Sequence, residues 1–235
     1  MKDRYILLTE KEIHLNLFNK LKRKFKEKTW FLINSKKDFN FKNIKKLRPK
    51  KIFIPHWSYK IPKEIFSQFN CILFHMTDLP FGRGGSPLQN LIVLGYNKTK
   101  ISAFKVEEEI DAGPIFLKKN LGLTGTSNEI FKRTARIIFS MIIEILEKDI
   151  KAIPQDGIPT YFMRRKPSES NIKNLKTINQ VYDYIRMLDS DGYPHAFIEN
   201  ENFIFKFREP FLKGKKIFTK VEITEKNEKN EKRKI

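Results

Sequence analysis

Two residues that can exchange protons, His75 and Asp111, each follow a segment with the character of a buried strand. His75 ends the apolar run CILFH, and Asp111 lies in the polar turn EEEIDAGP after the run KISAFKV. An imidazole beside a carboxylate can accept a proton, and the carboxylate stabilises the resulting cation. The pair is therefore a candidate for proton transfer if the fold brings the two side chains together.

Each of these residues also has a structural interpretation. A lone histidine at a strand end is more often structural than catalytic, and an aspartate before Ala112 and Gly113 is common in turns. Glycines at 82, 84 and 85 suggest a phosphate cradle, but neither Lys-Ser/Thr nor the pattern G-x-G-x-x-G accompanies them. As a nucleotide-binding signal this stretch is weak.

The elements that must position these residues alternate between strands and helices. Short apolar runs predict four strands, and residues 11–25 carry an apolar residue every fourth position, which predicts a helix. A polar helix is expected at 41–47. Strands that are apolar on both faces and separated by helices indicate a doubly wound, mostly parallel α/β sheet. The expected strands are 5–9, 30–34, 51–55 and 71–75.

The rest of the chain predicts a smaller C-terminal part. Ser86 and Pro87 form a helix start, Lys100–Val106 reads as a strand, and capping boxes at Thr126 and Thr177 open two further helices. The stretch from Ile153 is rich in proline and polar residues, as in a linker or crossover, and AFIENENFIFKF alternates like a hairpin. We expect domain limits at 1–154 and 155–222, with a disordered basic tail at 223–235.

Composition places the chain in a reducing compartment. One cysteine in 235 residues allows no internal disulfide, no Cys/His spacing suggests a metal site, and neither a signal peptide nor a membrane span is apparent. We expect a cytoplasmic protein without metal. The formal net charge of +20 favours phosphate-bearing partners, but much of it is lysine scattered over helix faces. A solvated surface and an anionic ligand, either a nucleotide or an RNA, both stay open.

The stretch CILFHMTDLPFGRGGSPLQNLI followed by EEEIDAGPI resembles the 10-formyltetrahydrofolate-dependent formyltransferases. That family includes methionyl-tRNA formyltransferases and N-formyltransferases of nucleotide-linked amino sugars. The resemblance covers roughly residues 51–207 and implies a Rossmann-like formyltransferase fold. Its motif is matched in register by His75, Leu79, Pro80, Arg83, Gly84, Pro87, Asp111 and Gly113.

The resemblance implies roles for individual residues. His75 would stabilise the oxyanion and relay a proton, with Asp111 as its partner and final proton acceptor. Further residues are expected to bind 10-formyltetrahydrofolate, namely Trp57, Tyr59, Ile61, Pro62, Arg83 and Gly84. Substrate-binding candidates are Thr77, Asn90, Arg164 and Arg165, the last two belonging to a basic cluster that is as readily a solvated one.

One departure from the family pattern concerns the oxyanion. The family's asparagine, two residues before the histidine, falls on Leu73, which cannot donate a hydrogen bond. Loss of one such donor costs about 3 to 4 kcal/mol of transition-state stabilisation. Thr77, Asn90 and a backbone amide of residues 84–86 are candidate replacements. Alternatively the chain is slower than its relatives, or binds folate without turnover.

From these observations we expect an enzyme that transfers a formyl group to a primary amine. The short C-terminal part favours a nucleotide-linked amino sugar as acceptor, whereas the basic charge favours the alternative, methionyl-tRNA. A folate-binding homologue without turnover is the third hypothesis. The oligomeric state, a homodimer included, stays open.

Overall fold

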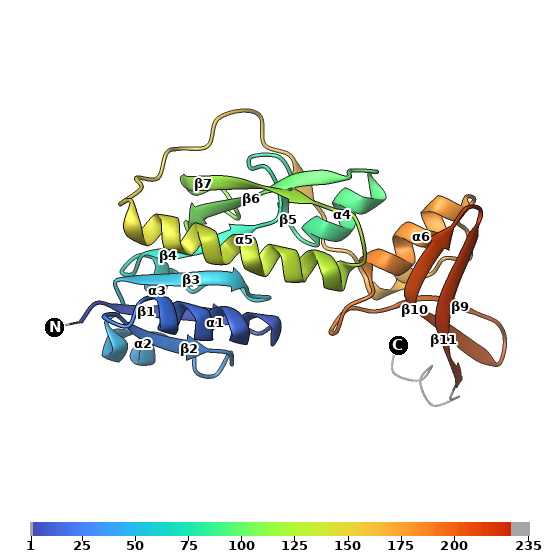
Figure 1. Cartoon of the computed structure of the whole chain (residues 1–235), viewed down its shortest axis with the longest axis horizontal. Coiled ribbons are helices and arrows are strands. Elements are labelled where there is room, and N and C mark those ends of the chain that lie inside the picture. Colours follow the sequence, from blue (N-terminus) through green and yellow to red (C-terminus); the bar gives the residue numbers. More distant parts are fainter. Residues whose placement is uncertain (1, 227–235) are drawn as a thin grey trace. The chain divides into compact units, whose positions relative to one another are not determined.

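The computed structural model describes residues 2–226, and its central feature is a six-stranded mixed sheet (Figure 1). The strand order is β2-β1-β3-β4-β6-β7. The first four of these strands run parallel, whereas β6 and β7 are antiparallel to their neighbours. The bounds are β1 (Arg4–Thr9), β2 (Thr29–Ile33), β3 (Lys51–His56), β4 (Cys71–His75), β6 (Lys98–Lys105) and β7 (Ile115–Gly122).

Helices cover both faces of this sheet. On one face, α2 (Phe41–Leu47) and α3 (Lys63–Phe66) bury Ile44 and Ile65 in a cluster with Ile6, Ile52 and Ile54. On the other face, Phe25 at the end of α1 (Ile13–Lys24) lies with its ring 6.4 Å from that of Trp30. Helix α5 (Ser127–Glu147) lies beside α1, with Lys24 Nζ 3.4 Å from Glu147 Oε1. The predicted doubly wound α/β fold is confirmed.

The two antiparallel strands show what the residue pattern identified and what it missed. The predicted strand at 100–106 corresponds to β6, but β7 was not predicted. Its sequence IFLKKNLG carries two lysines and is only partly buried, because β7 lies at the edge of the sheet. An edge strand needs apolar residues on one face only, so its signal is weak.

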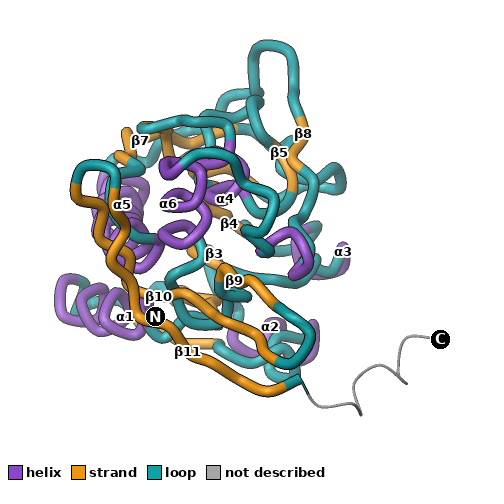
Figure 2. The backbone as a smooth tube through the Cα atoms, turned by 90° about the vertical axis from the view of Figure 1, so that its right-hand side faces the viewer, coloured by secondary structure: helices purple, strands orange, loops and turns teal. Residues whose placement is uncertain are grey.

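The segment after α5, which the sequence predicts to be a linker or crossover, returns to the loop that follows β4. Strand β8 (Tyr161–Phe162) pairs in parallel with β5 (Arg83–Gly84), as Figure 2 shows. Arg83 N donates to Thr160 O at 2.9 Å, and Gly85 N donates to Phe162 O at 3.0 Å. The crossover is thus hydrogen-bonded to the glycine-rich loop.

The described residues form two compact units. The first comprises residues 2–87, 98–123 and 131–163, and the second comprises 88–97, 124–130 and 164–226. Gln155, where the sequence predicts a domain boundary, lies within the first unit in this division, and the predicted domain limits stay a prediction.

The second unit contains an antiparallel sheet of three strands in the order β11-β10-β9, together with a predicted helix. Helix α6 begins with the predicted capping box, in which Gln180 N donates to Thr177 Oγ1 at 3.2 Å. The bounds are α4 (Pro87–Val93), η1 (Pro167–Ser170), α6 (Ile178–Met187), β9 (Ala196–Glu199), β10 (Phe203–Lys213) and β11 (Lys216–Glu225).

The predicted tail begins too early. Residues 223–225 belong to β11 and pair with β10, because Ile223 lies opposite Phe205 and Thr224 opposite Ile204. The residue pattern does not predict this strand, because its lysines and glutamates alternate with the apolar residues and resemble the low-complexity stretch that follows. Residues 227–235 lie outside the described part of the chain.

Across residues 2–226, none of the helices combines the length and the apolar character needed to span a bilayer.

Candidate active site

The loop after β4 is anchored to the neighbouring strand β6. Ser102 Oγ donates to Thr77 O at 2.7 Å and accepts a hydrogen bond from Leu79 N at 3.2 Å. Asp78 pairs with Lys100, whose Nζ lies 2.8 Å from Oδ2, and with Lys118. Burial raises the pKa of Asp78, but the hydrogen bonds from Lys100 and Lys118 outweigh it and leave that pKa below its ordinary value. The first residues of the loop are therefore held in one position.

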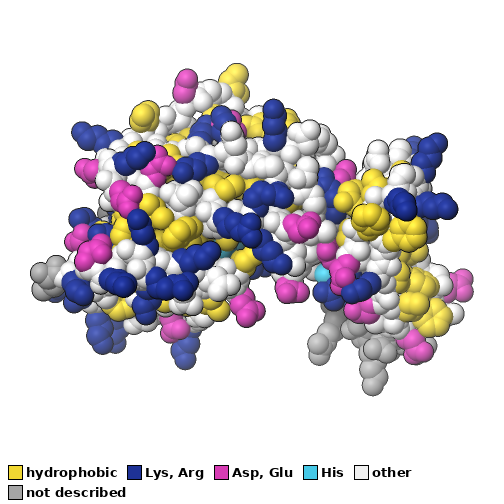
Figure 3. All heavy atoms as spheres, viewed as in Figure 1, with side chains coloured by type: hydrophobic (Ala, Val, Ile, Leu, Met, Phe, Trp, Pro, Cys, Tyr) yellow, Lys and Arg dark blue, Asp and Glu magenta, His cyan; other side chains and the backbone are white. Residues whose placement is uncertain are grey.

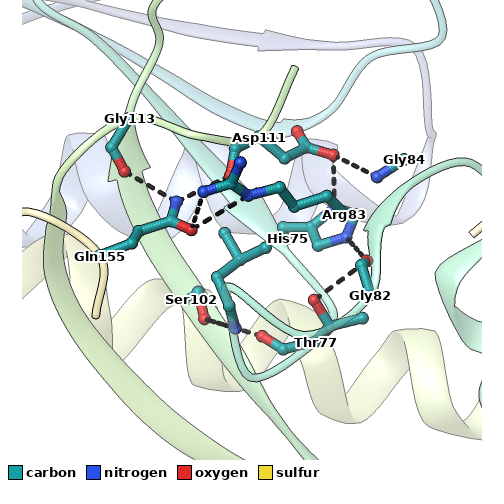
Figure 4. A network of polar contacts seen from close by, with 10 residues as sticks. His75, Thr77, Gly82, Arg83, Gly84, Ser102, Asp111, Gly113 and Gln155 are labelled. Atoms are coloured by element: carbon teal, nitrogen blue, oxygen red, sulfur yellow. Dashed lines mark hydrogen bonds and ion pairs between the residues drawn. The ribbon is translucent and has the colours of Figure 1, made fainter. Parts of the chain in front are cut away.

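His75 is buried at the carboxyl end of β4, and one of its ring nitrogens is occupied by the loop. Nε2 lies 2.8 Å from the carbonyl oxygen of Gly82, which can only accept, so Nε2 carries the proton in the neutral ring. Nδ1 then has its lone pair free. It faces Asp111, with Oδ2 at 3.7 Å (Figure 4). The fold thus brings together the two residues that the sequence singles out.

Asp111 is held in its turn by its own side chain. Its φ of 54° lies in the left-handed region, which aspartate tolerates better than most residues. Oδ2 accepts a hydrogen bond from Gly84 N at 2.8 Å. The same oxygen that faces His75 is therefore fixed by the glycine-rich loop.

Two glycines of the motif are required by close backbone approach. A Cβ on Gly113 would lie 1.8 Å from Lys105 O, and one on Gly84 would lie 2.5 Å from Phe162 O. Gly84 also has a φ of 102°, which other residues rarely adopt. These glycines shape the contacts around Asp111.

Gln155, which was not predicted as a site residue, fixes the main chain of the same turn. Its Nε2 donates to Asp111 O at 2.7 Å and to Gly113 O at 2.9 Å. Its Oε1 accepts from Arg83 Nη2 at 2.9 Å and from Arg83 Nε at 3.2 Å (Figure 4). No spacing in the sequence links residue 155 to residue 111; the crossover is placed here by the antiparallel bridge between Ile115 and Ile153 and by the pairing of β8 with β5.

Arg83 is buried and fully engaged within this network. Besides Gln155 it contacts Glu109, with Nη1 2.9 Å from Oε1, and Tyr161, whose hydroxyl lies 3.4 Å from Nη1. Tyr161 also donates to Glu109 Oε1 at 3.0 Å. Arg83 thus connects the glycine-rich loop, the acidic turn and the crossover. Its predicted contact with a cofactor stays a prediction.

The residues predicted to bind the pterin lie after β3, the strand next to β4. Ile61 is buried, and Trp57 packs partly buried against the same apolar cluster. Tyr59 is 44% exposed, and its ring lies 5.5 Å from that of Trp57. Pro62 caps α3. These side chains form an aromatic shelf, Trp57, Tyr59, Ile61 and Pro62, in which two aromatic rings remain partly open to solvent.

Leu73 also packs against that apolar cluster, and several of the candidate substitutes for the missing amide are already engaged. Thr77 is fully buried, and its hydroxyl donates to Gly82 O at 3.3 Å. Gly84 N donates to Asp111, and Gly85 N donates to Phe162 O. In this conformation neither Thr77 nor these two amides has a proton left for an oxyanion.

The remaining predicted substrate residues lie in the second unit. Asn90 is on α4. Arg165 donates to Glu169 O at 2.9 Å and lies over the ring of Tyr184 at 5.3 Å, whereas Arg164 is exposed. Their roles in substrate binding stay predictions.

A second histidine at the same edge of the sheet is buried and neutral. His14 Nδ1 lies 2.7 Å from Thr9 Oγ1 at the carboxyl end of β1. Burial, reinforced by the charge of neighbouring His56 and Lys11, lowers the pKa of His14 to about 3. His14 therefore carries no charge near neutral pH.

Within the described residues, no three His, Cys, Asp or Glu side chains gather closely enough to hold a metal ion.

Comparison with known proteins places this geometry in a family. Residues 167–224 match the family model described as methionyl-tRNA formyltransferase, C-terminal domain. A solved methionyl-tRNA formyltransferase from Clostridium thermocellum is 47% identical, with a TM-score of 0.93, and the match covers 95% of this chain and all of that one. The chain belongs to the 10-formyltetrahydrofolate-dependent formyltransferase family.

Other relatives differ in length or share only the fold. A methionyl-tRNA formyltransferase from Thermotoga maritima is 29% identical over 177 residues, which are 72% of this chain and 56% of that protein. The chain thus spans about half the length of the curated relatives it matches. A sugar N-formyltransferase from a Shewanella species has a TM-score of 0.66 at 16% identity, covering 85% of this chain and 93% of that one.

Proposed function

We propose that this chain transfers a formyl group from 10-formyltetrahydrofolate to the amino group of methionyl-tRNA. The observation that carries the proposal is the 47% identity to a solved methionyl-tRNA formyltransferase whose whole length is matched. The residues alone favour an amino sugar over methionyl-tRNA as acceptor, whereas the similarity to known proteins supports methionyl-tRNA better. The short C-terminal part, which favoured the sugar, is matched by the C-terminal model of the tRNA enzymes.

The arrangement of His75 and Asp111 suits an amine that must lose a proton. A protonated amine gives up one proton to become nucleophilic and a second as the new C–N bond forms. When bound, 10-formyltetrahydrofolate supplies the formyl carbon and takes one proton on N10 as the old C–N bond breaks. The other proton must go to the protein or to water.

His75 Nδ1 is the atom that accepts this proton in our proposal. In the neutral ring it has a free lone pair, and a proton on it would lie between Nδ1 and Asp111 Oδ2, which are 3.7 Å apart. The carboxylate stabilises the resulting imidazolium. Because the Gly82 carbonyl occupies Nε2–H, the neutral ring keeps no donor for the oxyanion, so we assign His75 to proton transfer.

The aromatic shelf fits a flat heteroaromatic ring. Trp57 is half-buried and Tyr59 is exposed beside an apolar cluster, with Lys36 Nζ 4.4 Å from the centre of the Tyr59 ring. Aromatic rings of this kind stack on flat heteroaromatic groups. Strands β3 and β4 are neighbours in register, with Ile54 opposite Leu73, so the shelf and His75 follow the same edge of the sheet. Trp57, Tyr59, Ile61 and Pro62 would hold the pterin, as the resemblance implies.

The direct test is an assay of the purified chain with 10-formyltetrahydrofolate and methionyl-tRNA. We expect N-formylmethionyl-tRNA and one tetrahydrofolate per formyl group transferred, and loss of both products with His75→Ala. Uncharged tRNA is the control for hydrolysis of the donor. Tetrahydrofolate release without formylated amine would overturn the assignment.

Transfer to a nucleotide-linked amino sugar is the second candidate. It is favoured by the fold shared with the Shewanella enzyme, whose chain is matched over 93% of its length. A panel of such sugars, assayed under the same conditions, separates the two. Turnover of a sugar with kcat/KM above that of methionyl-tRNA would reverse our choice.

A further inference from the structure

A hollow of about 640 Å³ lies at the amino edge of the sheet, opposite the edge that holds His75. Strand β1 begins there at Arg4, β3 begins at Lys51, and α2 ends there at Leu47. In Figure 1 this is the edge nearest the N-terminus, and β3 points away from it. We call it the amino-edge pocket; it is lined by Lys2, Asp3, Arg4, Lys45, Lys46, Arg48 and Lys50.

The lining is almost entirely cationic. Six of these seven residues are lysine or arginine, and the one carboxylate, Asp3, is already paired with Lys50 at 3.0 Å. The hydrogen bond from Lys50 is the main cause that lowers the pKa of Asp3, so Asp3 stays ionised and neutralises one cation only. The pocket keeps a large positive charge near neutral pH.

Three of these cations stand exposed without acidic neighbours. Among the residues that the structure describes, no carboxylate lies within 4 Å of Lys45, Lys46 or Arg48. Arg48 follows α2 with a φ of 49°, a left-handed position that favours glycine or asparagine. The carbonyl end of α2 attracts Lys45 and Lys46. Lys50 is held by Asp3 at 3.0 Å, and Lys2 Nζ donates to Lys26 O at 3.4 Å, so neighbouring segments add cations to the same hollow.

The chemistry of the lining indicates phosphate groups and not bases. No aromatic side chain lines the pocket, so it offers no stacking platform. Lysine and arginine side chains that face solvent neutralise backbone phosphates without reading sequence. Basic residues elsewhere are spread over the surface, as Figure 3 shows, but here they line one hollow.

The amino-edge pocket is far from the candidate active site, so a ligand that contacts both must be large. A strand of six residues such as β1 spans about 20 Å, so the two edges of the sheet lie too far apart for one small metabolite to contact both. A folded RNA is large enough. We propose that the amino-edge pocket binds backbone phosphates of RNA. This inference deepens the proposed function, on which it rests, by assigning the body of the tRNA a second contact surface.

The test compares two triple variants with the same change in charge. The first variant reverses the charge at three positions of the pocket, with Lys45→Glu, Lys46→Glu and Arg48→Glu. The second reverses the charge of three exposed cations at α1, with Lys20→Glu, Lys22→Glu and Arg23→Glu. Binding of fluorescently labelled tRNA is measured by anisotropy between 50 and 300 mM salt. The pocket variant should bind at least tenfold more weakly at low salt, and its salt slope should fall by about two to three. The α1 variant should lose less than about threefold.

Three outcomes would overturn the inference. Equal losses in both variants would mean that only total charge matters, and an unchanged pocket variant would mean that RNA binds elsewhere. Circular dichroism and a thermal melt check folding, and Lys45→Gln, Lys46→Gln and Arg48→Gln give a milder version if reversal unfolds the chain. Inorganic phosphate is added as a competitor at low millimolar concentration. If it displaces labelled tRNA as well as unlabelled tRNA does at the same concentration of phosphate groups, the pocket is a small-anion site and the inference fails.

Binding is measured without catalysis, so failure of the proposed function can be recognised separately. The pocket variant can lose tRNA binding while neither it nor the wild-type chain formylates methionyl-tRNA. In that case RNA binding by the pocket is supported and the proposed function fails. If formylation occurs and the two triple variants differ in neither binding nor KM for methionyl-tRNA, the proposed function stands and the pocket fails.

Discussion

The two edges of the central sheet differ in how their polar groups are satisfied. At the carboxyl edge, the side chains of His75, Asp111, Arg83 and Gln155 are buried or half-buried, and each makes hydrogen bonds of 2.7 to 3.2 Å to the backbone or to another member of the set. At the amino edge, Lys45, Lys46 and Arg48 are exposed and have no ion pair among the described residues. The first arrangement restricts each side chain to one geometry, whereas the second leaves flexible charges.

This difference teaches what each edge can do. Chemistry on a reacting atom needs groups held to within a fraction of an ångström, which burial and hydrogen bonding provide. Attraction of a polyanion needs charge but little geometry, and it weakens as salt screens it. We therefore expect substitutions at the carboxyl edge to act on kcat and those at the amino edge to act on affinity and its salt dependence.

The largest effect should follow from removing the proton-transfer pair. His75→Ala and Asp111→Asn should each lower kcat by about 100- to 10,000-fold, because general acid–base catalysis contributes that much. Pre-steady-state transfer from 10-formyltetrahydrofolate to methionyl-tRNA measures the rate of the step itself. Folate binding, followed by quenching of tryptophan fluorescence, should persist. Rates within threefold of wild type for both variants would exclude the assigned roles.

Substitution of Gln155 tests whether kcat depends on how precisely the turn of Asp111 is positioned. Gln155→Leu removes the hydrogen bonds to Asp111 O and Gly113 O and leaves Arg83 with Glu109 and Tyr161 as its remaining partners. We expect kcat to fall by about 100-fold, the scale of a misplacement of roughly 1 Å, with KM for methionyl-tRNA little changed.

Gln155→Glu is the matched variant for this position. It keeps an acceptor for Arg83 but offers no donor to the two carbonyl oxygens. If Gln155→Glu matches wild type, the donors are dispensable and the positioning role is wrong.

Leu73 tests whether the carboxyl edge lacks a donor. Leu73→Asn should raise kcat by about tenfold, because an amide there would donate to the oxyanion, and part of the gain is lost by placing a polar group against an apolar cluster. Leu73→Met is the control for packing. A decrease in kcat with asparagine, at unchanged stability, would mean that another group already performs this role.

The smallest effect concerns stability as a function of pH. His14 has a pKa of about 3 in the fold against about 6.5 when unfolded, so between these values the unfolded chain binds more protons. Its contribution to stability is present above pH 6.5 and is lost at up to about 1.4 kcal/mol per pH unit as pH falls.

Urea unfolding at pH 5.0, 6.0 and 7.5 measures this contribution, with His14→Gln as reference. The difference in unfolding free energy between the two chains should shrink as pH falls. Carboxylates titrate in the wild-type chain and in the His14→Gln variant alike, so their contribution cancels in this difference. A difference independent of pH would show that His14 is charged or solvated in the fold.

The residue pattern predicted the elements that carry strong local signals. The buried runs at 51–55 and 71–75, the helix at 41–47 and the two capping boxes were all confirmed, because burial on both faces and cap side chains mark the sequence directly. Strands β7 and β11 were missed, because each is partly exposed and carries lysines among its apolar residues.

The sequence by itself determined that His75 ends a buried strand and that Asp111 lies in a polar turn before Gly113. It also determined the large positive charge. Only the tertiary structure decided which nitrogen of His75 faces Asp111, that Gln155 holds the acidic turn, and that cations from three segments line one hollow. Such features depend on contacts between distant residues, for example those of Gln155 with Asp111, 44 positions away, and with Arg83, 72 positions away, which no local periodicity encodes.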